Sequence, residues 1–368
     1  MTATVLGQRA LNRALLGRQH LLTRARMSAE AMIGHLVGMQ AQAPLAAYVG
    51  LWSRIGEFDP AELASLTTER KVVRATLMRG TVHLAVSGDA LSFRPLVDRA
   101  VASGFKGSFA RQLAGIDLGL VAKAGQELLA ERPRTRKELQ ELLGARWPDW
   151  DASAMAYAVS ALVPNVQVTP RGVWGSTGPA TLTTMEAWLG RPVDPSPSID
   201  SVVRRYLVAF GPASVADVQA WSGLTRLREV VERLDGLRTF RGESGTVLYD
   251  VEDGVLVDEE TPAPVRFLPE YDNVLLSHAD RSRVLPEGRR VPLPPGNGAS
   301  MGTVLLDGRY DADWRVRRNG DQAVLTVTGY RRFSTAERAE LAEEGAQLVA
   351  FVAPGMPADV RIVGNASA

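Results

Sequence analysis

Hydrophobic positions follow one order near the start of the chain: three stretches with helical spacing, and then two short alternating runs. Ser28 suits a helix N-cap and precedes the apolar spacing of SAEAMIGHLVGM. A break at residues 39–43 follows, Pro44 is placed to open a second helix, and Asp59-Pro60 is placed to open a third. The runs KVVRATLM and TVHLAVS, which meet at Arg79-Gly80, predict a β-hairpin. Three helices followed by a hairpin are the order of a winged helix.

The same order recurs twice with little sequence identity, as in a structural repeat maintained by hydrophobic pattern. In the second copy a helix near 119–130 precedes RKELQELLG, capped by Thr135, and ASAMAYAVSALV, capped by Asp151. Its wing is expected from VQVTP and GVWGS, around Arg171-Gly172. The third copy consists of IDSVVRRYLVAF, SVADVQAWSG and RLREVVERL, followed by the runs LRTFRG and TVLYDV.

The C-terminal part is strand-like, with the runs VRFLPEYDNVLLS, MGTVLLDGRY, DADWRVRR and QAVLTVTGY before the helix TAERAELAEEGAQLVAFV. Asn319-Gly320 is a strong type I′ turn signal, which predicts a hairpin between 313–318 and 322–328. We therefore expect an α+β protein of three tandem winged helix-turn-helix modules around a C-terminal β-rich, barrel-like domain, with a concave DNA-binding surface. The expected domains are residues 1–102, 117–190, 197–252 and 255–368. Linkers are expected near 103–119, which is rich in glycine and serine, and at the proline-rich 190–198.

The composition of the chain argues against several kinds of site. The chain has no cysteine and four widely spaced histidines, so we expect no disulfide, no metal site, no cysteine nucleophile and no cofactor. No window approaches the roughly 20 apolar residues of a membrane span, and the N-terminus lacks the pattern of a secretion signal. These features predict a cytoplasmic protein, one that is nucleoid-associated when it is bound to DNA.

The net charge of +1 does not decide for or against nucleic acid, because a DNA-binding face needs clustered positive charge. Basic residues do cluster near the second module's middle helix, in the loop 281–290 and along the hairpin at 319–320, whereas acidic runs lie apart at 252–260 and 337–344. This segregation favours double-stranded DNA as the partner, although any one of these charges can equally be a solvated surface group. The candidate DNA contacts are Arg134, Arg136, Lys137, Arg281, Arg283, Arg315, Arg317 and Arg318.

The break at residues 39–43 contains a Gln-Ala-Gln sequence. In an extended segment, residues two apart point the same way, so the side chains of Gln40 and Gln42 can project into one cleft. Two glutamines in a loop are more commonly solvated or capping groups. The residues alone leave both interpretations open.

Five segments together resemble the bacterial winged-helix DNA glycosylases that unhook interstrand crosslinks. They are GMQAQAPLAAYVGLWSRI, RATLMRGTVHLA, FLPEYDNVLLSHADRSRV, LLDGRYDADWRV and the terminal FVAP, and the resemblance spans essentially the whole chain. It implies that Gln40 and Gln42 are catalytic. The branch of the family that acts on simple alkyl adducts has a carboxylate where this chain has Gln42, so the resemblance favours the branch that gives self-resistance to azinomycin B-like alkylating products. Arg79 and His83 are candidates for lining the cleft, with a buried strand residue as the alternative for His83.

Neutral amides make chemical sense if the lesion is already cationic. A purine alkylated at N7 of guanine or N3 of adenine departs as a neutral base, so positioned water and electrostatic stabilisation suffice. No lysine lies near the motif, so we expect a monofunctional enzyme without lyase activity. We also expect it to act as a monomer. Candidates for a minor-groove probe are the hairpin at 319–320 and the loop 281–290. Other hypotheses consistent with the modules are a tandem winged-helix transcription regulator without catalytic activity and a protein-interaction scaffold.

Overall fold

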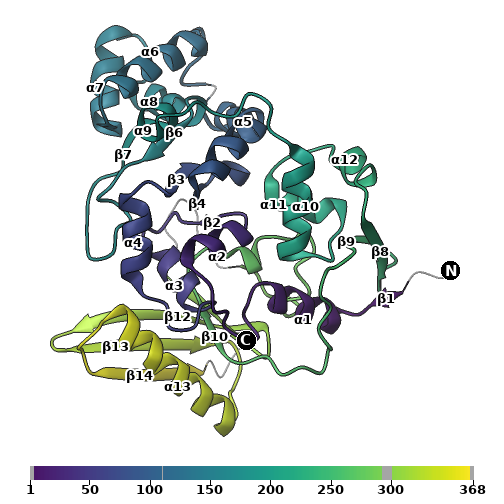
Figure 1. Cartoon of the computed structure of the whole chain (residues 1–368). Helices are drawn as coiled ribbons and strands as arrows, with labels where there is room; N and C mark the ends of the chain where they lie inside the picture. Colours follow the sequence, from purple (N-terminus) through teal and green to yellow (C-terminus); the bar gives the residue numbers. More distant parts are fainter. Residues whose placement is uncertain (1–3, 110, 292–300, 365–368) are drawn as a thin grey trace.

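The computed structural model of the chain describes residues 4–109, 111–291 and 301–364 and confirms a mixed α+β fold (Figure 1). In these residues the strands form three sheets, with orders β1-β8-β9, β2-β4-β3-β6-β7-β5 and β10-β11-β12-β13-β14. None of the helices described is long and apolar enough to cross a membrane.

The first predicted set of helices and strands is present. Helix α1 (Gln8–Arg18), which the pattern did not predict, precedes it. The elements of the set are α2 (Ala29–His35), β2 (Met39–Gln40), α3 (Ala46–Trp52), α4 (Pro60–Thr68), β3 (Val72–Thr76), the 3₁₀ turn η1 (Met78–Gly80) and β4 (Val82–Val86). Ser28 caps α2 and Asp59 caps α4, each accepting a backbone N–H with its side chain. Pro44 does not open the second helix, which starts two residues later at Ala46. The predicted break is partly a strand, because β2 pairs with β4.

The helices of the second set also lie where the pattern predicts them. The elements are α5 (Ser87–Phe109), α6 (Leu118–Glu131), β5 (Arg134–Thr135), α7 (Arg136–Arg146), α8 (Ala152–Leu162), β6 (Asn165–Gln167), β7 (Thr181–Thr184) and α9 (Met185–Leu189). Thr135 and Glu138 form a capping box at α7. Helix α5 continues into the first part of the predicted linker at 103–119.

The second wing differs from the prediction. Strand β6 pairs with β7 at 181–184, and GVWGS forms turns instead of a strand. The physical reason is a competing partner: the hydroxyl of Tyr48 donates to the carbonyl oxygen of Gly172 and accepts from the backbone N–H of Trp174. These bonds dock the loop on α3 and occupy groups that a strand would pair in its ladder.

The third set comprises α10 (Ile199–Phe210), α11 (Val215–Ser222), α12 (Arg228–Glu232), β8 (Leu237–Gly242) and β9 (Val247–Val251). The predicted hairpin is formed by β8 and β9, and β1 (Val5–Leu6) adds to it in parallel. The first two hairpins share one six-stranded sheet through the pairing of β3 with β6. The first two sets are therefore continuous with each other.

The C-terminal part is an open sheet, so the barrel-like prediction is wrong. Its elements are β10 (Arg266–Leu268), η2 (Asn273–Leu275), β11 (Gly302–Leu306), β12 (Arg309–Asn319), β13 (Gln322–Gly329), α13 (Thr335–Val352) and β14 (Ala358–Gly364). Strands β10 and β14 are its two edges, and α13 packs on one face through residues such as Leu341 and Leu348. Because α13 buries the apolar face of the sheet, the sheet does not need to close into a barrel to bury it. The predicted hairpin is confirmed, but its turn is Gly320-Asp321, one residue later than expected, because Asn319 still pairs with Gln322 and only Gly320 of the predicted dipeptide has a positive φ.

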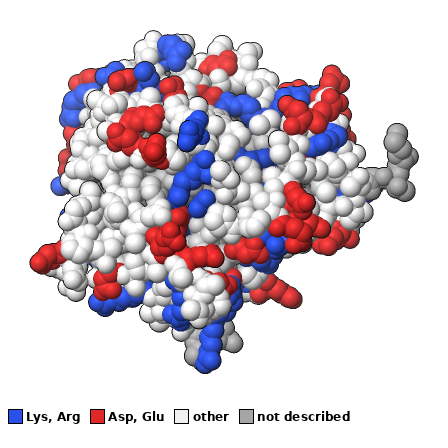
Figure 2. Space-filling model, turned by 60° about the horizontal axis from the view of Figure 1, so that its bottom comes forward, with Lys and Arg blue, Asp and Glu red and all other residues white. Residues whose placement is uncertain are grey.

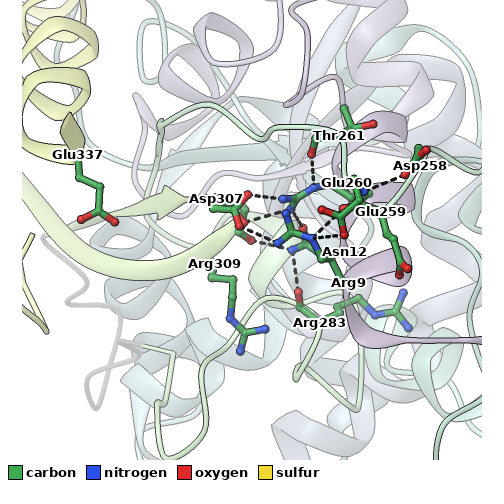
Figure 3. A network of polar contacts seen from close by, with 12 residues as sticks. Arg9, Asn12, Asp258, Glu259, Glu260, Thr261, Arg283, Asp307, Arg309 and Glu337 are labelled. Atoms are coloured by element: carbon green, nitrogen blue, oxygen red, sulfur yellow. Dashed lines mark hydrogen bonds and ion pairs between the residues drawn. The ribbon is translucent and has the colours of Figure 1, made fainter. Parts of the chain in front are cut away.

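A polar network fixes α1 to the turn between β11 and β12, as Figure 3 shows. Arg9 donates to a carboxylate oxygen of Asp307 at 2.8 Å, and Arg13 also pairs with this carboxylate. The side-chain amide of Asn12 donates to the carbonyl oxygens of Arg283 and Gly308, at 2.7 and 2.8 Å. The N-terminal helix therefore holds together two segments that lie more than 270 residues away along the chain.

Candidate active site around Gln40 and Gln42

The Gln-Ala-Gln segment is held by the first hairpin. Strand β2 pairs antiparallel with β4, which places Gln40 opposite His83, and the N–H of Ala41 donates to the carbonyl of Val82. Opposite residues of an antiparallel pair share one face of the sheet. Gln40 is buried, with 6% of its surface exposed, whereas Gln42 just beyond the strand is half-buried.

The two glutamine side chains contact each other directly, with Gln40 Nε2 donating to Gln42 Oε1 at 2.6 Å. Arg79 Nη2 donates to Gln40 Oε1 at 2.8 Å. Because a guanidinium can only donate, the amide oxygen of Gln40 must face Arg79 and its NH₂ group must face Gln42. The arginine thereby fixes the orientation of the first amide, which in turn directs the second.

Arg79 lies at the tip of the first hairpin, in the 3₁₀ turn η1, and has a left-handed φ of 56°. Besides Gln40, its guanidinium donates to Asn273 Oδ1 at 3.0 Å and to the backbone carbonyl of Trp221 at the end of α11. Burial and the nearby charge of Arg281 lower the pKa of Arg79 to about 10, so it is still charged at neutral pH. One side chain thus joins the hairpin, α11 and the segment that follows β10.

That last segment supplies residues which sequence reasoning missed. Asn273 is buried, and Asp272 beside it accepts two hydrogen bonds from Arg54, at 2.8 and 2.9 Å, in a buried ion pair. Both residues lie in the FLPEYDN sequence, which the family resemblance included without a role for them. Only the resemblance could have singled them out, because their partners are distant in sequence.

His83 is a fully buried strand residue, as the alternative interpretation proposed. Its Nδ1 lies 3.0 Å from the carbonyl of Thr81, so this nitrogen carries the proton. Its Nε2 is buried without a hydrogen-bond partner among the residues described. Burial and the charge of Arg79 lower the pKa of His83 to about 3, so the ring is neutral at physiological pH.

The predicted DNA contacts divide by exposure. Arg134 and Arg283 are buried: Arg134 pairs with Glu131, and Arg283 donates to the carbonyl of Pro212. Neither guanidinium can meet a phosphate in this conformation, so we do not retain these two as contacts. Arg281 is half-buried near Arg79, and Arg315 is half-buried on β12. The exposed members are Arg136, Lys137, Arg317 and Arg318.

On the face shown in Figure 2, basic and acidic side chains are less clearly separated than the sequence predicts. Figure 2 shows basic side chains gathered in a short line near the centre of the face turned forward, with acidic groups on either side. Positive charge on this face is therefore local, and does not form one uninterrupted area.

A cavity of about 480 Å³ opens beside the Gln-Ala-Gln segment, starting at Ala43 and Pro44. In the described part of the chain, no group of three or more histidine or acidic side chains is placed to hold a metal ion.

Known proteins resemble this chain over most of its length. The family model described as DNA glycosylase AlkZ-like matches residues 33–351. The interstrand DNA cross-link repair glycosylase of Streptomyces sahachiroi is 26% identical over 326 residues, which cover 81% of this chain and 85% of that protein. The solved structure of Streptomyces sahachiroi DNA glycosylase AlkZ superposes with a TM-score of 0.75 at 21% identity, over 98% of this chain and 100% of the other.

Proposed function

The chain belongs to the AlkZ-like family of DNA glycosylases, and from this premise we propose that it hydrolyses the N-glycosidic bond of N7-alkylguanine-type lesions and unhooks interstrand crosslinks in double-stranded DNA. The observation that carries the proposal is the amide pair of Gln40 and Gln42, in which Gln40 donates to Gln42 and accepts from Arg79. Its consequence in the cell would be self-resistance to an azinomycin B-like alkylating product.

A pair of neutral amides fits a lesion that already carries positive charge. Alkylation at N7 weakens the C1′–N9 bond, so catalysis needs a positioned water and stabilisation of the developing oxocarbenium ion. We assign the water to Gln42, the more exposed of the two amides, and assign Gln40 the role of orienting it. Removing the group that holds water should cost on the order of 10² to 10⁴ in rate.

The bond changes are those of a simple hydrolysis. The oxygen of water bonds to C1′ as the C1′–N9 bond breaks, the bonding electron pair neutralises the purine, and the proton from water passes to solvent. Gln40 and Arg79 bond to each other, and their further partners are Gln42, Asn273 and the carbonyl of Trp221, none of which is a lysine. We therefore propose a monofunctional enzyme that leaves an abasic strand uncut.

For the scaffold, we propose that the three sets of helices and hairpins act as winged-helix modules that grip DNA around a concave surface, in a monomeric cytoplasmic protein. The exposed Arg136, Lys137, Arg317 and Arg318 are assigned to phosphates, together with the half-buried Arg281 and Arg315. Arg281 is close enough to Arg79 to lower its pKa, which would place a phosphate contact beside the amide pair.

The test is incubation of the protein with duplexes that carry either N7-methylguanine or an N7–N7 crosslink, followed by denaturing gels with and without alkali. We expect alkali-labile abasic sites in the first substrate and separated strands in the second. Intact lesions at excess enzyme, together with tight binding of an undamaged specific sequence, would instead identify a transcription regulator.

A further inference from the structure

Arg74 is a buried arginine that has no carboxylate partner among the residues described. It lies on β3 with 3% of its surface exposed, and its Nε and Nη2 donate to Oε1 of Gln167 on β6, at 3.3 and 3.2 Å. Burial and the like charge of Arg171 lower the pKa of Arg74 to about 10, so the guanidinium is still charged at neutral pH. A buried charge is costly unless a group of opposite charge lies beside it, which makes this a place for an anion.

Arg74 lines a small pocket of about 70 Å³. The other walls come from the first residue of α7, the end of α8 and the strands β6 and β7. Sites that hold drug-sized molecules measure roughly 300–1,000 Å³, so this pocket has room for a small group only. Among the described residues that line it, none is acidic.

Arg136, the first residue of α7, supplies a second guanidinium to the same pocket. This guanidinium lies over the ring of Tyr157, 4.1 Å from the ring centroid, which restricts its position. Within the described part of the chain, Arg136 forms no ion pair either. Gln167 adds a neutral donor, because its amide oxygen accepts from Arg74 and its NH₂ group is left for another partner. The pocket thus combines two positive charges with an amide donor.

We propose that this pocket binds one phosphate group, which Arg74 and Arg136 hold together. Guanidinium groups match the oxygens of a phosphate in charge and geometry. The phosphate can come from the backbone of a bound duplex or from free phosphate in solution. Because Arg136 is exposed, the pocket is accessible to a duplex, and we name the DNA backbone as the source in the cell. That choice of source rests on the proposed function.

A phosphate at this position acts on the hairpin that supports the catalytic pair. Strand β3 carries Arg74 and ends at Thr76, and Arg79 follows at the tip of the same hairpin, where it donates to Gln40 Oε1. Binding at Arg74 therefore attaches the DNA backbone to the element that orients the first amide. Arg74 is thereby added to the phosphate contacts, although burial alone would leave it out.

The first measurement is the affinity for an undamaged duplex over a series of salt concentrations, for the wild type, Arg74→Met, Arg136→Ala and the double variant. Each phosphate contact contributes about 0.9 to the slope of log affinity against log salt. If both arginines hold one phosphate, the double variant lowers the slope by about 0.9, and neither single variant lowers it further. A loss of about 1.8 in the double variant would show two separate contacts and would overturn the shared pocket.

Arg228→Ala is the matched control for Arg136→Ala. Arg228 is also the exposed first residue of a helix, α12, but it pairs with Glu232 at 3.2 Å. This variant should keep the wild-type slope. An equal loss of slope in Arg228→Ala would overturn the assignment, because removal of any exposed arginine would then have the same effect.

The second measurement identifies the source of the phosphate. Thermal unfolding is followed without DNA, in inorganic phosphate and in chloride at equal ionic strength. A midpoint that phosphate raises by about 1–2 °C in the wild type, but not in Arg74→Met or Arg136→Ala, shows that the pocket takes free phosphate. A lower salt slope without this rise assigns the pocket to the DNA backbone alone.

If neither the salt slope nor the response to phosphate changes in the variants, the phosphate site is overturned. Should Arg74→Met fail to fold, the exposed Arg136→Ala decides both comparisons. Neither measurement requires excision, so a failure of the glycosylase proposal leaves this test intact.

Discussion

Replacing Arg79 by alanine tests whether this residue positions the catalytic pair. The guanidinium donates to Gln40 Oε1, to Asn273 Oδ1 and to the carbonyl of Trp221. A hydrogen bond to a charged donor contributes about 1.5–3 kcal/mol. Because part of the Arg79 side chain is exposed, water can replace part of this hydrogen-bond energy. We therefore take the lower half of that energy range for the bond that orients Gln40. At about 1.4 kcal/mol per factor of ten, excision should slow by about tenfold to fortyfold.

The assay is single-turnover excision of N7-methylguanine over a series of enzyme concentrations, which separates the rate at saturation from the concentration needed for half-saturation. The positioning role predicts that Arg79→Ala lowers the saturating rate and leaves the half-saturating concentration within about twofold. Asn273→Ala, which keeps the contact between Arg79 and Gln40, should slow excision less. A loss confined to the half-saturating concentration would show that Arg79 is a DNA ligand and would refute the positioning role.

Three further predictions concern the supports of the site. Gly223 has a φ of +76°, and a Cβ added there would lie 3.0 Å from the Cα of Arg79, so Gly223→Ala should reduce both thermal stability and the excision rate. The matched control is Gly245→Ala, which has a φ of +82° but open space around it and should reduce only thermal stability. The pKa values of His83 and His278 are each about 3, below the ordinary 6.5, so the unfolded chain binds protons that the folded chain resists. As the pH is lowered from about 6.5 to 3, the free energy of unfolding measured in urea should therefore fall by up to about 1.4 kcal/mol per pH unit for each histidine. His83→Gln should remove one of these two contributions. A free energy of unfolding that does not change with pH would contradict the neutral buried rings. Arg317→Ala should reduce the slope of log affinity against log salt by about 0.9, and an unchanged slope would remove Arg317 from the phosphate contacts.

Local signals predicted many of the elements because they act over a few residues. Ser28, Asp59, Thr135 and Asp151 all cap helices as their sequence contexts indicate. The hairpin signalled by Asn319-Gly320 is also present, although its turn lies one residue later, at Gly320-Asp321. The missed second wing strand shows the limit. Its loop bonds to Tyr48, more than 120 residues earlier, and no pattern within the loop reveals that partner.

The candidate site divides in the same way. Alternation in an extended segment correctly predicted that Gln40 and Gln42 point together, because that depends on adjacent backbone geometry. The contributions of Asn273 and Trp221 depend on how distant segments pack around Arg79. Arg134 and Arg283 show the converse error: charge in a sequence predicts exposure, but both side chains satisfy backbone carbonyls in the interior.

The central claim is that the amide of Gln42 holds the water that attacks C1′, and it is tested most directly by Gln42→Ala on an N7–N7 crosslinked duplex at saturating enzyme. The account predicts wild-type affinity for the duplex and a normal unfolding transition, with an unhooking rate lowered by about 10² to 10⁴. Unhooking at the wild-type rate in this variant would contradict the account.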